Sequence, residues 1–210
     1  MLRSIRSTRR PRLTAALLAT LGAVALIPAG ASASTTYFGS SLNHTPANAG
    51  STCAEDGVMG STLCTHVGSY YPGFSGRAKA TVNGTVTAFK VRAQGPTTMT
   101  FRLVKVQHLS ANHKTGQAKT VVVGPKVHVK GPTTNQAENS IYPVETFKTH
   151  LKVKKGYEVA IDTKSNTAEY CSDGTPGQML FDPFLKLGQG FRTNNGIDGC
   201  LMLVQAVVKH

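Results

Sequence analysis

The residues with the most obvious chemistry are four cysteines: Cys53, Cys64, Cys171 and Cys200. In an exported chain an even number of cysteines predicts disulfides, and four cysteines allow three pairings. We favour Cys53–Cys64 and Cys171–Cys200, because each pair brackets a stretch rich in Gly, Ser and Asn that would gain from closure. A zinc site is the alternative, but neither pair has C-x2-C spacing or a histidine at ligand spacing. We therefore predict two disulfides, no metal and no other cofactor.

Oxygen-bearing side chains gather near the second cysteine pair. Asp173 follows Cys171, and Asn194, Asn195 and Asp198 precede Cys200. A Cys171–Cys200 bridge would hold these segments together, and calcium prefers carboxylate and amide oxygens. Asp-Gly and Asn-Gly are also the commonest turn sequences. We predict turns here, and this end is our preferred candidate for a ligand or ion site.

Other catalytic and binding patterns are weak. There is no G-x-S-x-G nucleophile elbow, and the few acids fall mostly at loops or strand ends, so no hydrolase is indicated. The seven histidines show no H-x-H or H-E-x-x-H pattern, and we assign them to solvated faces. Tyr70 and Tyr71, in a Gly/Ser/Pro loop, are the one candidate pair for stacking on a sugar, although packing of that loop is the simpler explanation for them. We predict no enzyme.

The N-terminus is typical of a secretory signal peptide. Five arginines precede an apolar stretch from Leu13 to Ile27, and Ala31-Ser32-Ala33 offers the small residues needed for cleavage. The apolar stretch is shorter than the ~20 residues that span a bilayer, so we expect no transmembrane anchor after cleavage. We expect a signal peptide over 1–33 and one domain over 34–210, secreted or associated with the cell envelope.

The domain without its signal peptide stays basic. Its net charge is 18 − 10 = +8, because five of the 23 basic residues leave with the signal peptide. Such a surplus favours anionic cell-wall polymers or glycans as partners, or serves only solubility. The basic residues have the outward parity of ordinary strands, so no specific nucleic-acid role is indicated.

Hydrophobic alternation predicts an all-β fold. Residues 34–76 form a looped segment pinned by a disulfide, and about eight strands follow over 77–210, which favours a two-sheet β-sandwich of jelly-roll type. Near 103–104 the apolar set changes parity, which predicts a β-bulge, and Gly124-Pro125 should separate two strands. In the strand over 157–162, Glu158 and Asp162 are expected to face out.

Three segments carry a family resemblance: Gly84-Thr-Val-Thr-Ala-Phe-Lys-Val-Arg92, Thr100-Phe-Arg-Leu-Val-Lys105, and the run from Phe147 through Lys155-Gly156-Tyr-Glu-Val-Ala-Ile-Asp162. The chain resembles exported actinobacterial β-sandwich proteins of unassigned function, over about residues 38–208. Phe89 replaces the usual Trp, and Tyr157-Glu158 replaces the usual Gly-Asp. The resemblance implies the fold and no activity, and it places Arg92 and Arg102 on the sheet surface. We expect a non-enzymatic module with a structural or adhesive role, with glycan binding by the loop tyrosines as the alternative and a hydrolase least supported.

Overall fold

The structure is a computed structural model and describes residues 33–47, 51–52, 63–69, 71, 76–171 and 177–210. Ala33–His210 form one compact unit, and the regular secondary structure of its described residues is β-strand apart from one short helix. Every pairing between two of the described strands is antiparallel, and one isolated bridge, from Ala47 to Tyr170, is parallel. The predicted all-β class is therefore confirmed.

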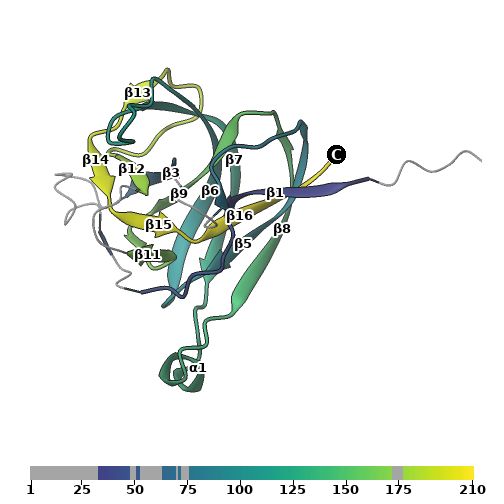
Figure 1. The fold of residues 1–210 in the computed structure, drawn as a ribbon, viewed down its shortest axis with the longest axis vertical. Helices are drawn as coiled ribbons and strands as arrows, with labels where there is room; N and C mark the ends of the chain where they lie inside the picture. Colours follow the sequence, from purple (N-terminus) through teal and green to yellow (C-terminus); the bar gives the residue numbers. More distant parts are fainter. Residues whose placement is uncertain (1–32, 48–50, 53–62, 70, 72–75, 172–176) are drawn as a thin grey trace, which may run out of the picture. The chain divides into compact units, whose positions relative to one another are not determined.

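A five-stranded sheet contains the first and the last described strands side by side (Figure 1). Its order is β4 (Gly76–Arg77), β1 (Thr35–Ser40), β16 (Val204–Lys209), β5 (Gly84–Arg92) and β8 (Val144–Val153). In β5, Phe89 and Val91 are fully buried, as their alternation predicts.

The larger sheet has seven strands. Its order is β13 (Arg192–Thr193), β7 (Gln117–Val129), β6 (Thr97–Gln107), β9 (Tyr157–Thr163), β3 (Cys64–Gly68), β12 (Gln178–Phe181) and β14 (Gly196–Asp198). Two short pairs complete the strands: β2 (Ser51–Thr52) with β10 (Ser165–Asn166), and β11 (Glu169–Cys171) with β15 (Cys200–Met202).

The only helix among the described residues, α1 (Thr134–Glu138), lies in the connection between β7 and β8. Figure 1 shows it at the far end of the connection between β7 and β8, away from the strands. Thr133 and Gln136 form a capping box at its N-terminus, which explains why this polar segment makes a helical turn.

The main hydrophobic core combines side chains from both large sheets. Phe89 of β5 stacks on Phe101 of β6 with 4.2 Å between the ring centroids, and Phe38 of β1 lies in the same cluster. Burying large aromatic side chains contributes much of the stability of such a core.

A second cluster covers the opposite face of the seven-stranded sheet. It contains Val104 of β6 and Ala160 of β9, and the segment that follows β12 packs on it through Leu185. The backbone of Leu185 is tied to the sheet twice, because its carbonyl accepts from Thr120 Oγ1 at 2.8 Å and its N–H donates to Thr65 Oγ1 at 2.8 Å. Both faces of this sheet are therefore buried over much of its area.

This second layer overturns three expectations. Glu158 is fully buried, Asp162 is 3% exposed and Arg102 is 5% exposed, although all three were expected at the surface. Alternation places them opposite the main core, but at these three residues that side is largely covered by other parts of the chain. Arg102 and Asp162 compensate each other's charge through an ion pair and a 2.5 Å hydrogen bond from Nε.

The predicted bulge lies at the expected level but on the neighbouring strand. The pairing of β6 with β7 shifts register between Leu103 and Val104, whereas β6 pairs with β9 without a break. The extra residue is therefore in β7. At Leu103 and Val104 the apolar residues pass from odd to even positions, and this was wrongly interpreted as a bulge in β6 itself. In the structure β6 keeps its alternation, with Leu103 in the main core and Val104 in the second cluster on the opposite face.

The expected break at Gly124-Pro125 is also wrong, because β7 runs through it. At this level the only described neighbour of β7 in the sheet is β6, since β13 pairs with Gln117 and Ala118 alone. An edge position tolerates proline, because its missing N–H would point to solvent.

Candidate functional site

The Cys171–Cys200 disulfide is present and defines the end of the molecule that the sequence favours as a site. The two cysteines are directly opposite each other in the β11–β15 pair, with 4.0 Å between their Cα atoms. Such close approach suits a pair of residues that do not hydrogen-bond to each other across antiparallel strands. The expected Cys53–Cys64 bridge involves Cys53, which lies outside the described residues.

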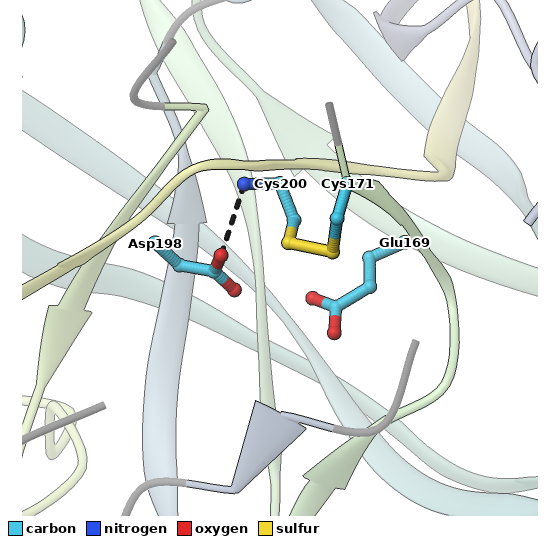
Figure 2. Close-up of side chains that lie close together, drawn as sticks. All are labelled: Glu169, Cys171, Asp198 and Cys200. Atoms are coloured by element: carbon cyan, nitrogen blue, oxygen red, sulfur yellow. Dashed lines mark hydrogen bonds between the residues drawn. A yellow bond between two sulfur atoms is a disulfide. The ribbon is translucent and has the colours of Figure 1, made fainter. Parts of the chain in front are cut away.

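Two buried carboxylates lie beside this disulfide. Glu169 is fully buried on β11, and Asp198 is 6% exposed at the end of β14. Figure 2 shows both carboxylates on the same side of the disulfide, pointing toward each other. One ligand-type atom from each of these four residues lies within 4.8 Å of the others. The sulfurs are joined in a disulfide and are not thiolates, so the carboxylates are the groups able to hold a cation here.

The local chain explains how Asp198 reaches this place. Its Oδ1 accepts a hydrogen bond from the backbone N–H of Cys200 at 2.9 Å, as Figure 2 also shows. An Asp side chain bonded to the backbone two residues ahead makes its own turn. This turn carries the chain from β14, which pairs with β12, to β15, which pairs with β11.

An amide connects the two carboxylates. Gln178 Nε2 donates to Glu169 Oε2 at 3.0 Å and to Asp198 Oδ2 at 3.4 Å, while Gln178 Oε1 accepts from Asn166 Nδ2 at 3.2 Å. Gln178 and Asn166 are both buried, and Gln178 pairs directly with Asp198 in the sheet. The described contacts therefore form a polar network, and a hard cation would have to displace or turn the Gln178 amide.

His66 borders this network and is fully buried, which contradicts its assignment to a solvated face. Burial lowers its pKa to about 4, although a side-chain interaction with Gln178 opposes the shift. Its Nε2 lies 3.4 Å from Cys64 Sγ. The imidazole is therefore neutral near pH 7.

Most of the predicted site residues serve the fold. Asn194 Oδ1 accepts from the N–H of Gly116 at 2.9 Å, and Asn195 Oδ1 accepts from the N–H of Asp182 at 2.9 Å. Both asparagines therefore stabilise loops, which is the role that the turn interpretation gives them. Among the described candidates only Asp198 lies beside the disulfide, where it forms an acidic pair with Glu169. Asp173 lies outside the described residues.

The tyrosine candidates are only partly described. Tyr71 is 9% exposed, and burial raises the pKa of its hydroxyl above the ordinary value. A buried ring offers no platform for a sugar, which favours the packing explanation for Tyr71. Tyr70 lies outside the described residues.

The outer face of the five-stranded sheet is a second candidate, of a different kind. Along β8 the side chains alternate, so that Lys148, His150 and Lys152 are exposed while Phe147 and Leu151 pack against the core. Lys90 and Lys209 occupy outward positions on β5 and β16, because their neighbours Phe89, Val91 and Val208 are core residues. We call these four lysines and His150 the basic face.

Comparison with known proteins adds no assignment: no family model, no curated protein and no solved structure matches this chain. Among the described residues, no helix is long and apolar enough to cross a membrane. A disulfide is compatible with an extracellular location.

Proposed function

We propose that this protein is a non-enzymatic exported β-sandwich module of jelly-roll type that binds anionic polymers at the cell envelope. The proposal rests mainly on one observation: the basic face contains four lysines and a histidine on three adjacent strands of one sheet. A surface of one charge sign attracts polymers of the opposite sign over the range of the Debye length.

The distribution of acids supports this choice of surface. Within the five strands of this sheet the only acid is Glu145 of β8. Its parity places it on the core side, and its Oε1 accepts from the N–H groups of Lys130 at 2.9 Å and Gly131 at 3.0 Å. No described carboxylate on these strands therefore competes with a ligand for the lysines.

An aromatic group extends the same sheet at its other edge. Tyr37 of β1 is 47% exposed, and the guanidinium of Arg77 lies 6.0 Å from its ring centroid. A polymer that carries both sugars and charges would find a stacking surface beside the cations. Glycan contact through Tyr37 is thus better supported than contact through Tyr71.

The test is binding of a purified anionic wall polymer to the triple variant Lys90→Ala/Lys148→Ala/Lys152→Ala. Exposed ion pairs contribute roughly 0.2–1 kcal/mol each, so three should contribute roughly 0.6–3 kcal/mol. We expect binding at 50 mM salt to weaken by about 3- to 150-fold. Raising the salt should weaken binding of the parent far more than binding of this variant.

A matched control removes the same number of charges elsewhere. Lys105, Lys114 and Lys186 are exposed and belong to β6 or to loops outside the five-stranded sheet. Their triple alanine variant should bind the polymer nearly as the parent does. Equal losses in the two triple variants would show that net charge alone attracts the polymer and would refute a dedicated face.

A further inference from the structure

A cleft of about 700 Å³ opens on the seven-stranded sheet, away from the basic face. It is lined where β6 begins and where β7 and β9 end, and its volume lies in the range of small-molecule sites, ~300–1,000 Å³. Leu63, Pro96 and Met99 supply apolar parts of its wall.

The strand register places polar groups side by side in this cleft. Thr98 is opposite His128, and Thr100 is opposite Lys126 on one side and Asp162 on the other. Alternation puts these residues on the face opposite the main core, which contains Met99 and Phe101. The five side chains come from three adjacent strands and all line the cleft.

Positive charge predominates around the cleft. Lys126 and Lys164 line it and are exposed, while the Asp162 carboxylate is paired with Arg102. Arg102 Nη1 is buried and makes no hydrogen bond among the described residues, so donor capacity remains next to Asp162. Two lysines and one arginine against one carboxylate leave a net of two positive charges, which favours an anion.

The kind of cation favours phosphate over carboxylate. Planar carboxylates are recognised best by the two parallel N–H groups of an arginine, but the described residues that line the cleft include no arginine, and Arg102 beside it is already bound to Asp162. Lysines act as point charges and are common phosphate ligands. His128 adds a ring nitrogen, and its Nδ1 lies 3.3 Å from Thr98 Oγ1.

The cleft also offers hydrogen-bonding groups for ligand hydroxyls. Thr98 and Thr100 can each donate and accept a hydrogen bond. Asp162 accepts from Thr65 Oγ1 at 2.6 Å and from Arg102 Nε at 2.5 Å, which fixes its carboxylate in place. Oδ2 is contacted by both Nε and Nη2 of Arg102, whereas Oδ1 accepts, among the described residues, from Thr65 alone and has a further lone pair able to accept from a ligand hydroxyl.

We propose that this cleft binds a phosphorylated polyol, with the phosphate at Lys126 and Lys164 and the hydroxyls at Thr98, Thr100 and Asp162. The site is separate from the basic face and does not depend on it. The ligand is either a free phosphorylated polyol or a unit of a polyol phosphate polymer.

The experiment titrates sn-glycerol 3-phosphate, inorganic phosphate and glycerol into the full protein, followed by amide NMR shifts. We expect shifts concentrated over 96–100, 126–128 and 162–165, and binding of glycerol 3-phosphate about tenfold tighter than phosphate because of the added hydrogen bonds. Lys126→Ala/Lys164→Ala should weaken binding about 2- to 30-fold. Thr98→Val should reduce the preference over phosphate and leave phosphate binding unchanged.

Lys148→Ala on the basic face is the matched control and should change nothing in this titration. The proposal is overturned if phosphate binds as tightly as glycerol 3-phosphate, if the double lysine variant binds like the parent, or if the shifts lie on another surface. Poly(glycerol phosphate) added to the triple variant of the basic face separates the two ligand sources. Residual binding that needs Lys126 and Lys164 indicates the polymer unit, whereas binding of the monomer alone indicates the free compound.

Discussion

Removing the Cys171–Cys200 disulfide tests how much it contributes to the free energy of unfolding. This disulfide lies beside the acidic pair formed by Glu169 and Asp198. The bridge joins residues separated by 29 positions. Constraint of the unfolded chain by a loop of this length stabilises the folded state by roughly 3–4 kcal/mol. That is a large share of the ~5–15 kcal/mol typical of folded domains.

The variant to measure is Cys171→Ser/Cys200→Ser, because removing both cysteines leaves no unpaired thiol to form new bridges. For a domain of 150–250 residues, 1 kcal/mol shifts the melting temperature by roughly 2–4 °C. We therefore expect a fall of about 6–16 °C in a thermal melt followed by circular dichroism. Lys148→Ala, an exposed change on β8, should shift it by no more than about 2 °C.

Proteolysis gives a second measurement of the same variant. Lys164 is exposed and lies just before β10 and β11, the strands that lead to Cys171. Without the bridge, β11 is held by its short pairing with β15 and by contacts of its neighbours, so trypsin should cut after Lys164 faster than in the parent. A variant that melts within about 2 °C of the parent and resists trypsin equally would refute the reasoning.

Three further predictions concern buried charges. Arg102→Met leaves the Asp162 carboxylate buried without its ion pair, so denaturant unfolding should show a loss of about 3–5 kcal/mol, and Arg102→Met/Asp162→Asn should recover part of it. Burial raises the pKa of Glu158 from 4.5 to about 8, with Lys79 opposing the shift. The folded state therefore holds a proton that the unfolded state has lost, and stability should fall as the pH rises from 4.5 to 8; melts of Glu158→Gln should lack this decline, and an identical decline would contradict it. The pKa of His66 is lowered from 6.5 to about 4, so stability should fall as the pH drops through that window, and the fall should be smaller in His66→Gln.

Several strands after residue 77 could be predicted from local patterns, whereas β1 and β3 lie in the segment 34–76, which was wrongly predicted as looped. Alternating apolar residues define β5, β6, β8 and β9 within a few positions, because a strand with one buried face has a period of two. The two-residue strands β2, β4, β10 and β13 could not be predicted in this way. They contain too few residues to show a period, and their positions depend on the strands they pair with.

The burial of Arg102, Glu158 and Asp162 could not be predicted from alternation. A period of two assigns residues to two faces, but it does not say whether the second face is solvated. Here the chain after β12 packs over it, and Phe184 lies 5.3 Å from the Arg102 guanidinium. Val104 and Val106 on that same face are the local sign of a covered surface, and they were attributed to a bulge.

The acidic pair follows from a pattern that was present but not used. Glu169 and Asp198 each precede a cysteine by two residues, in Glu-Tyr-Cys and Asp-Gly-Cys. In an extended chain residues two apart share a face, so a Cys171–Cys200 bridge places each acid on the side that carries a sulfur. Antiparallel strands would still separate the acids along their length, because Glu169 is opposite Met202 and not Asp198. The turn made by the Asp198 side chain removes that separation, and Gln178, which is opposite Asp198 in the β12–β14 pair, then connects the carboxylates. The pattern thus predicts which residues approach the disulfide. The contact between the two carboxylates depends on the sheet pairing, because β14 pairs with β12 while β15 pairs with β11.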